Sequence, residues 1–196
     1  MKNRKIKRMV GIALLMAMVI VLQFVGGMIP PIGGTVSISL VLIPIVLGSA
    51  VYGPGAGALL GATFAVVTII NCITGTDAGG AMVFQASPVL CILVVAAKSI
   101  LAGLAAGYVY KLLEKRNGYI AMLCAAIICP VVNTGVFVGC MALFFSDVLS
   151  AWASGSDVLS YVLMSLILCN FVPEMLINVV FSPAGNNIVR VINKTK

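Results

Sequence analysis

Long apolar runs, separated by short breaks of glycine, proline or charge, are the feature that most limits how this chain can fold. Several runs reach the roughly 20 residues that an α-helix needs to cross a bilayer. Hydrophobic residues make up 62% of the chain and charged residues only 9%, against about 25% charged residues in an ordinary soluble domain. The sequence lacks the short alternating strands of a membrane β-barrel. It therefore predicts an all-α integral membrane protein.

The breaks divide the chain into six expected membrane helices, which we expect to pack as one bundle in a single transmembrane domain over residues 1–196. The expected helices cover about 9–27, 36–52, 55–74, 87–112, 119–145 and 159–181. The tail after residue 181 is amphipathic and is expected to form a turn or helix at the membrane interface. The N-terminus is similar to a signal peptide, but its apolar run is of spanning length and no cleavage motif follows, so we expect it to remain as the first helix.

The positions of lysine and arginine predict the orientation of the bundle. Five lie in residues 2–8, three lie between the fourth and fifth helices, and three lie at the C-terminus. With six crossings these groups share one side, which the positive-inside rule assigns to the cytoplasm together with both termini. Asp77, Asp147 and Asp157 fall in loops on the other side. Because the basic residues cluster at membrane edges, the net charge of +7 indicates contact with anionic lipid, not nucleic acid.

Lys98 is the one basic residue inside an apolar run, and it belongs to a polar cluster at one depth. It lies about ten residues, or about 15 Å, below the outer end of its helix, near the midplane of a core about 30 Å thick. Asn133, Asn170 and Glu174 fall at comparable depths on the fifth and sixth helices. Small residues follow Lys98 at helical spacing, so we expect it to point into the bundle.

The polar cluster has two interpretations. Charged residues inside membranes face the protein interior or a wet cavity and usually pair. In the structural interpretation, Lys98 and Glu174 form a buried ion pair, and the asparagines satisfy backbone groups freed by prolines. In the functional interpretation, Lys98, Asn133, Asn170 and Glu174 line a ligand pocket open to the outside, with Lys98 facing an anionic or carbonyl group. A pair used in both ways is also possible.

Several kinds of chemistry have no basis in the sequence. There is no P-loop motif for ATP, and without histidine a Ser-His or Cys-His nucleophile cannot form. The six cysteines lack C-x-x-C spacing, which excludes the usual zinc sites. No two carboxylates lie close together in an apolar run. We therefore expect a protein that is not an enzyme and needs no cofactor or metal.

The expected helices contain small residues at helical spacing and several prolines. Ala13 and Ala17 form one small-xxx-small face, which permits close packing on a partner protein or within the bundle. Glycines at the same spacing occur on the third, fourth and fifth helices, and they favour packing inside the bundle: Gly53, Gly57, Gly61, Gly103, Gly107, Gly135 and Gly139. Pro44, Pro130 and Pro173 are expected to interrupt their helices and to free a backbone carbonyl in each.

These features together resemble one transporter family. A basic N-terminus, six hydrophobic helices in under 200 residues and A-x-x-x-A on the first helix are similar to the substrate-binding S component of an energy-coupling factor (ECF) transporter. The stretch "ISLVLIPIVLGSAVYGPGAGALLGATFAVV" (38–67) resembles the second and third helices of that family. "CPVVNTGVFVG" (129–139) resembles its fifth helix.

The resemblance implies a subunit of the bacterial cytoplasmic membrane that captures a water-soluble vitamin from outside. It implies a membrane coupling (T) subunit, which Ala13 and Ala17 would contact, and two cytosolic ATPase subunits. The ligand would be held in the outer half by the fourth to sixth helices, which carry Lys98, Asn133, Asn170 and Glu174. The loops over 26–37 and 71–85 would complete the site.

A single lysine suits one carboxylate, so pantothenate is the preferred ligand, with riboflavin, folate or a pyrimidine precursor as alternatives. Riboflavin-binding members carry a lysine shortly after an asparagine on the sixth helix, whereas Asn170 is followed here by Pro173 and Glu174. Two other classes of function stay open. One is a stand-alone secondary transporter that uses Lys98 and Glu174 as a proton-linked pair. The other is a membrane scaffold in which Lys98 only neutralises Glu174.

Overall fold

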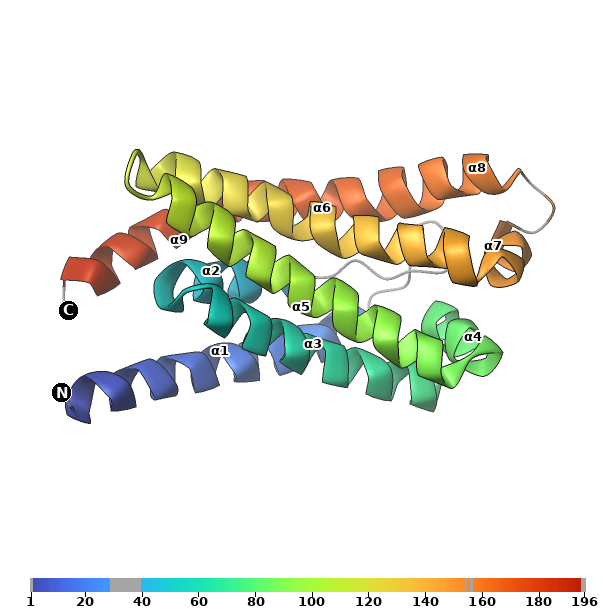
Figure 1. Ribbon diagram of the computed structural model, residues 1–196, viewed down its shortest axis with the longest axis horizontal. Helices are drawn as coiled ribbons and strands as arrows, with labels where there is room; N and C mark the ends of the chain where they lie inside the picture. The colour runs from blue at the N-terminus through green and yellow to red at the C-terminus, as the bar shows by residue number, and fades with distance from the viewer. Residues whose placement is uncertain (1, 29–39, 154, 156, 195–196) are drawn as a thin grey trace.

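The computed structural model describes residues 2–28, 40–153, 155 and 157–194. These residues form helices and contain no β-strand, which confirms the all-helical prediction. The helices are α1 (Lys2–Met28), α2 (Leu42–Tyr52), α3 (Pro54–Thr74), α4 (Ala78–Ala86), α5 (Pro88–Leu113), α6 (Gly118–Phe144), α7 (Ser146–Ala153), α8 (Val158–Tyr161), the π-helix η1 (Val162–Phe171) and α9 (Val172–Lys194). The long helices run along the length of the bundle, and both termini lie at one end of it (Figure 1).

Five helical segments are long and apolar enough to cross a membrane. They cover Lys5–Gly27, Pro54–Thr74, Pro88–Leu113, Gly118–Phe144 and Val158–Ile192. The shorter apolar helix α2 has 11 residues, a length of about 16 Å at 1.5 Å per residue. The predicted second helix began at residue 36, and residues 36–39 lie outside the described part. The chain is thus a multi-pass helical membrane protein, while a sixth crossing stays a prediction.

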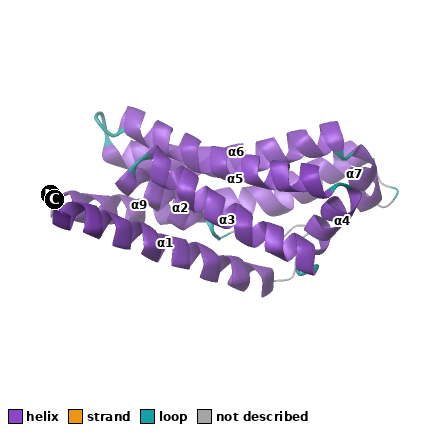
Figure 2. Cartoon of the chain, turned by 60° about the horizontal axis from the view of Figure 1, so that its bottom comes forward, coloured by secondary structure: helices purple, strands orange, loops and turns teal. Residues whose placement is uncertain are grey.

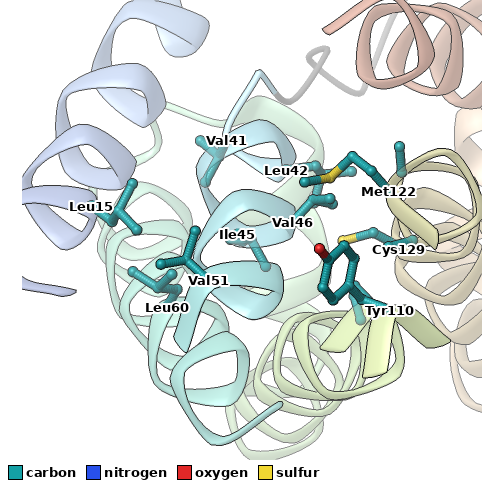
Figure 3. Close-up of a cluster of buried hydrophobic side chains, with 14 of the residues drawn as sticks. Leu15, Val41, Leu42, Ile45, Val46, Val51, Leu60, Tyr110, Met122 and Cys129 are labelled. Atoms are coloured by element: carbon teal, nitrogen blue, oxygen red, sulfur yellow. The ribbon is translucent and has the colours of Figure 1, made fainter. Parts of the chain in front are cut away.

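The short helix α2 lies in the main apolar core. Its residues Leu42 and Ile45 are fully buried and lie between Leu60 of α3 and Met122 of α6 (Figure 3). Burial of a leucine or isoleucine side chain is worth roughly 1.5–3 kcal/mol, so these contacts hold α2 in the bundle. The prediction that Pro44 interrupts this helix is wrong. Pro44 is the third residue of α2, in the first turn, where a backbone N–H has no helical partner to lose.

The C-terminal part of the chain is one continuous helical run over residues 158–194. The helix continues past the predicted boundary at 181, so the tail forms a helix, one of the two outcomes expected for it, as far as the structure describes it. Pro173 is the second residue of α9 and lies two residues after Phe171, the last residue of the π-helix η1. Since proline cannot donate to the carbonyl four residues back, a change of helix type here is physically reasonable. Pro130 lies inside α6, which continues as one α-helix from Gly118 to Phe144, so the prediction that this proline interrupts its helix is wrong.

Two short helices, α4 and α7, were not predicted and lie at the end of the bundle opposite the termini (Figures 1 and 2). α4 begins within the stretch 71–85 that was expected to be a loop and ends one residue beyond it, at Ala86. Its N-cap is Asp77, whose side chain accepts a hydrogen bond of 3.1 Å from the backbone N–H of Gly80. The connection between α5 and α6 lies at the same end as the termini (Figure 1). The predicted basic groups thus share one end, and its cytoplasmic location stays a prediction.

The helices α3 and α5 touch through their backbones. A Cβ atom added at Gly57 would overlap the carbonyl of Gly103, and one added at Gly61 would overlap the carbonyl of Ser99. Ser49 ties α2 to the same crossing, because its hydroxyl donates a hydrogen bond of 3.0 Å to the carbonyl of Gly103. The prediction that glycines of these two helices pack inside the bundle is confirmed for Gly57, Gly61, Gly103 and Gly107.

The glycines of α6 and Gly53 behave differently. A Cβ at Gly135 or Gly139 would meet no heavy atom within 4 Å among the described residues, and both glycines are exposed. The expectation that this pair packs inside the bundle is therefore wrong. Gly53 joins α2 to α3 with a φ of 91°, a conformation that glycine adopts at little cost.

We expect Gly103→Ala to lower the free energy of unfolding by about 2 kcal/mol, because the new methyl group would press against rigid backbone. Gly135→Ala is the matched control on a site with open space. It should leave stability unchanged or raise it slightly, since alanine favours helix by up to about 1 kcal/mol. Thermal or denaturant unfolding in detergent measures both variants. Equal effects of the two substitutions would contradict the close α3–α5 contact.

Candidate ligand-binding site

A cavity of about 60 Å³ lies among α1, α3, α5, α6, η1 and α9. The four predicted site residues, which come from four different helical elements, all line it: Lys98, Asn133, Asn170 and Glu174. The other lining residues are Gln23, Gly26, Gly27, Phe64, Thr68, Asn71, Thr76, Asp77, Thr134 and Phe137. The cavity has room for several water molecules, and its wall is mainly polar although the bundle is apolar.

Lys98 points into the bundle, as expected from the small residues that follow it. Ala102 and Ala106, one and two turns along α5, are fully buried. The Lys98 ammonium lies 4.6 Å from the centre of the Phe137 ring and 6.0 Å from that of Phe64. An ammonium at this range is attracted to the face of an aromatic ring, most strongly where water is excluded. The rings thus help to hold the charge inside the bundle.

The side chains of Asn133 and Asn170 are buried at the cavity wall. They are only 5% and 8% exposed, and the Oδ1 atom of each has no hydrogen-bond partner among the described residues. A buried acceptor without a donor costs about 1–3 kcal/mol. These two amides are therefore suited to accept hydrogen bonds from a molecule in the cavity.

Two carboxylates line the same cavity as the Lys98 ammonium. Glu174 of α9 is 2% exposed, and its backbone carbonyl accepts a hydrogen bond of 2.8 Å from the side chain of Asn178. Asp77 is half-buried at the start of α4. Opposite charges at the wall of one cavity attract strongly where the dielectric constant is low. Lys98 and Glu174 therefore line the same cavity. Both interpretations, a structural pair and a set of ligand contacts, require this arrangement.

Sequence reasoning missed Phe64 and Thr68 of α3 and included Asn71 only as the start of an expected loop. Phe64, Thr68 and Asn71 line the cavity, and Gln23 of α1 donates a hydrogen bond of 3.5 Å to the hydroxyl of Thr68. The spacing i, i+4, i+7 puts these three residues on one helix face, so two polar residues at that spacing in an apolar helix were a usable signal. Asp77 was expected in an outer loop, within the stretch 71–85 that would complete the site, and in the structure it is the N-cap of α4.

The two expected ligand loops contribute in part. The stretch 71–85 supplies Asn71, Thr76 and Asp77 to the cavity. The stretch 26–37 supplies Gly26 and Gly27, at the end of α1, and its residues 29–37 lie outside the described part of the chain. The cavity thus lies toward the end of the bundle opposite the termini.

An aromatic stack joins the cavity to the short helices at that end. The rings of Phe137 and Trp152 lie 6.5 Å apart at an angle of 30°. The indole N–H of Trp152 points to the sulfur of Met82 at 3.3 Å, which links α7 to α4. Phe137 thus lines the cavity, and Trp152 packs against it from outside the wall.

Ala13 and Ala17 lie on α1, as Gln23 does, but they do not line the cavity. Both are exposed on α1, where Leu14 and Met18 are also exposed. Leu15 and Val19 form the buried side of the helix. This outer face of α1 is available to lipid or to another membrane protein.

A comparison with curated proteins finds no match. The family model described as "ECF transporter, substrate-specific component" matches residues 7–184, a range that includes every residue named above at the cavity wall. The chain therefore belongs to the family of ECF transporter substrate-specific components.

Proposed function

We propose that this chain captures a water-soluble vitamin or related micronutrient from outside the cell. It delivers the ligand for ATP-driven uptake in the bacterial cytoplasmic membrane. A separate membrane coupling subunit and two cytosolic ATPases complete the transporter. The observation that carries the proposal is a polar cavity inside an apolar helical bundle, in a chain of a substrate-specific family. Such a cavity is costly in a membrane and marks a functional site.

The four predicted residues of the cavity wall bind different groups of the ligand. Lys98 faces an anionic or carbonyl group of the ligand, and Glu174 faces a donor. The unpartnered amide oxygens of Asn133 and Asn170 accept hydrogen bonds from the ligand and so fix its orientation. With the termini in the cytoplasm, the cavity opens toward the outside, near α4 and α7.

Mass spectrometry of small molecules released from the chain tests this proposal. The chain is purified alone in mild detergent, denatured, and its released fraction compared with that of Lys98→Met. We expect one vitamin-like compound in near-stoichiometric amount from the wild type and little from the variant. An empty protein that also binds no member of a vitamin panel would overturn the proposal. Uptake that persists without any ATPase would instead favour a proton-linked secondary transporter.

A further inference from the structure

We propose that the ligand is a flat nitrogen heterocycle that is neutral or positively charged and offers N–H donors, not a carboxylate. The inference rests on the proposed function and names the chemical class that the same cavity selects. It changes the preference drawn from the sequence, in which a single Lys98 favoured an acid such as pantothenate.

The charges at the cavity wall are the first argument. Of the described residues that line it, Lys98 is the one cation, and it faces two carboxylates, Asp77 and Glu174. Asp77 is half-buried and therefore partly screened by water, whereas Glu174 is 2% exposed. Even with Asp77 discounted, no excess of positive charge remains to hold a carboxylate. A carboxylate ligand would add a second or third negative charge to one small cavity of low dielectric constant.

The hydrogen-bonding groups are the second argument. Asn133 and Asn170 each bury an Oδ1 atom that has no donor within the described part of the chain, and both carboxylates are acceptors as well. The two unpartnered amide oxygens require hydrogen-bond donors from the ligand. A ring with amino, amide or ring N–H groups supplies them, whereas a carboxylate offers only further acceptors. A site with buried acceptors rejects ligands that leave them unpaired.

The aromatic side chains are the third argument. Phe64 and Phe137 both line the cavity, and Trp152 backs the Phe137 ring in a stacked arrangement. A flat ring gains from offset stacking on such a side chain. The Lys98 ammonium, within 6.0 Å of both ring centres, is then placed to donate to a ring nitrogen or carbonyl oxygen of the heterocycle.

Binding of a matched set of vitamins to the purified chain, measured by calorimetry, tests the inference. One group carries no carboxylate: thiamin, pyridoxamine, nicotinamide and riboflavin. The other consists of carboxylates: nicotinate, pantothenate and biotin. We expect the tightest ligand to come from the first group. Nicotinamide should bind at least 10-fold more tightly than nicotinate, which differs from it only in the amide group.

The variant Glu174→Gln adds a second measurement on the same set. It keeps the size of the side chain and removes its charge, so it should weaken binding of the cations thiamin and pyridoxamine at least 10-fold. Its effect on neutral nicotinamide should stay below about 3-fold.

A carboxylate as the tightest ligand, or equal effects of Glu174→Gln on cations and neutral compounds, would overturn the ligand class and leave vitamin capture intact. Failure of every compound to bind, together with the absence of a released vitamin, would overturn the proposed function and this inference with it.

Discussion

Lys98→Met is expected to weaken ligand binding at least about 100-fold, or about 2.7 kcal/mol. The ammonium lies over the Phe137 ring at 4.6 Å and is the one cation among the described residues of the cavity wall. A hydrogen bond from a charged group contributes about 1.5–3 kcal/mol. Its removal also leaves Glu174 without its nearby opposite charge. Methionine keeps the length and apolar stem of lysine, so the loss reports the charge and not the packing.

The controls for Lys98→Met separate binding from folding. Lys111→Met removes a lysine at the other end of α5 and should bind ligand normally. Loss of one member of a buried ion pair can itself destabilise a protein by 3–5 kcal/mol, so thermal unfolding in detergent is followed in parallel. The double variant Lys98→Met with Glu174→Gln restores neutrality and should recover stability but not binding. Normal ligand binding by Lys98→Met would assign Lys98 to the structural interpretation.

Ala17→Trp is expected to reduce uptake to background while ligand binding stays within about 3-fold of the wild type. Ala17 lies on the exposed face of α1, away from the cavity, where an indole cannot touch the ligand. Small residues permit close helix contacts in a membrane, and a large ring there would separate α1 from the proposed coupling subunit. Ala13→Trp, one turn away, should behave in the same way. Uptake into vesicles that contain all subunits measures the effect.

The control for Ala17→Trp is Val180→Trp. Val180 of α9 is 71% exposed, so it offers an indole the same access to lipid on another helix, and we expect normal uptake. Joint loss of binding and uptake in the alanine variants would show that these residues support the fold and not a partner.

The long helices followed from the sequence because lipid leaves few choices to an apolar segment of that length. The ends at Thr74 and Leu113 fall within one residue of their predicted positions. Prediction from the sequence failed where one residue is compatible with two local structures. Pro44 can either break a helix or begin one, and only the position of the first turn decides between them. The small helices α4 and α7 are shorter than a membrane crossing, so no length argument reveals them.

The site was predictable where depth along a helix could be counted. Four polar residues were predicted at comparable depths in the membrane, and in the structure they line one cavity: Lys98, Asn133, Asn170 and Glu174. Asp77 could be assigned only to the expected loop over 71–85, because its approach to the cavity depends on the helix that it caps. Phe64 and Phe137, whose rings lie near the Lys98 ammonium, are apolar residues in an apolar chain. Only the packing of the helices distinguishes them from the other phenylalanines.

The backbone contact between α3 and α5 has a consequence for how the cavity can open. Helices that touch without intervening side chains cannot slide or tilt separately without a backbone clash. The wall formed by α3 and Lys98 of α5 is therefore a preassembled half-site that keeps its shape before the ligand arrives. Any change in the shape of the cavity is therefore expected to come from other elements, such as the η1–α9 run, which carries Asn170 and Glu174. A ligand would thus dock on a fixed surface and be enclosed from the opposite side.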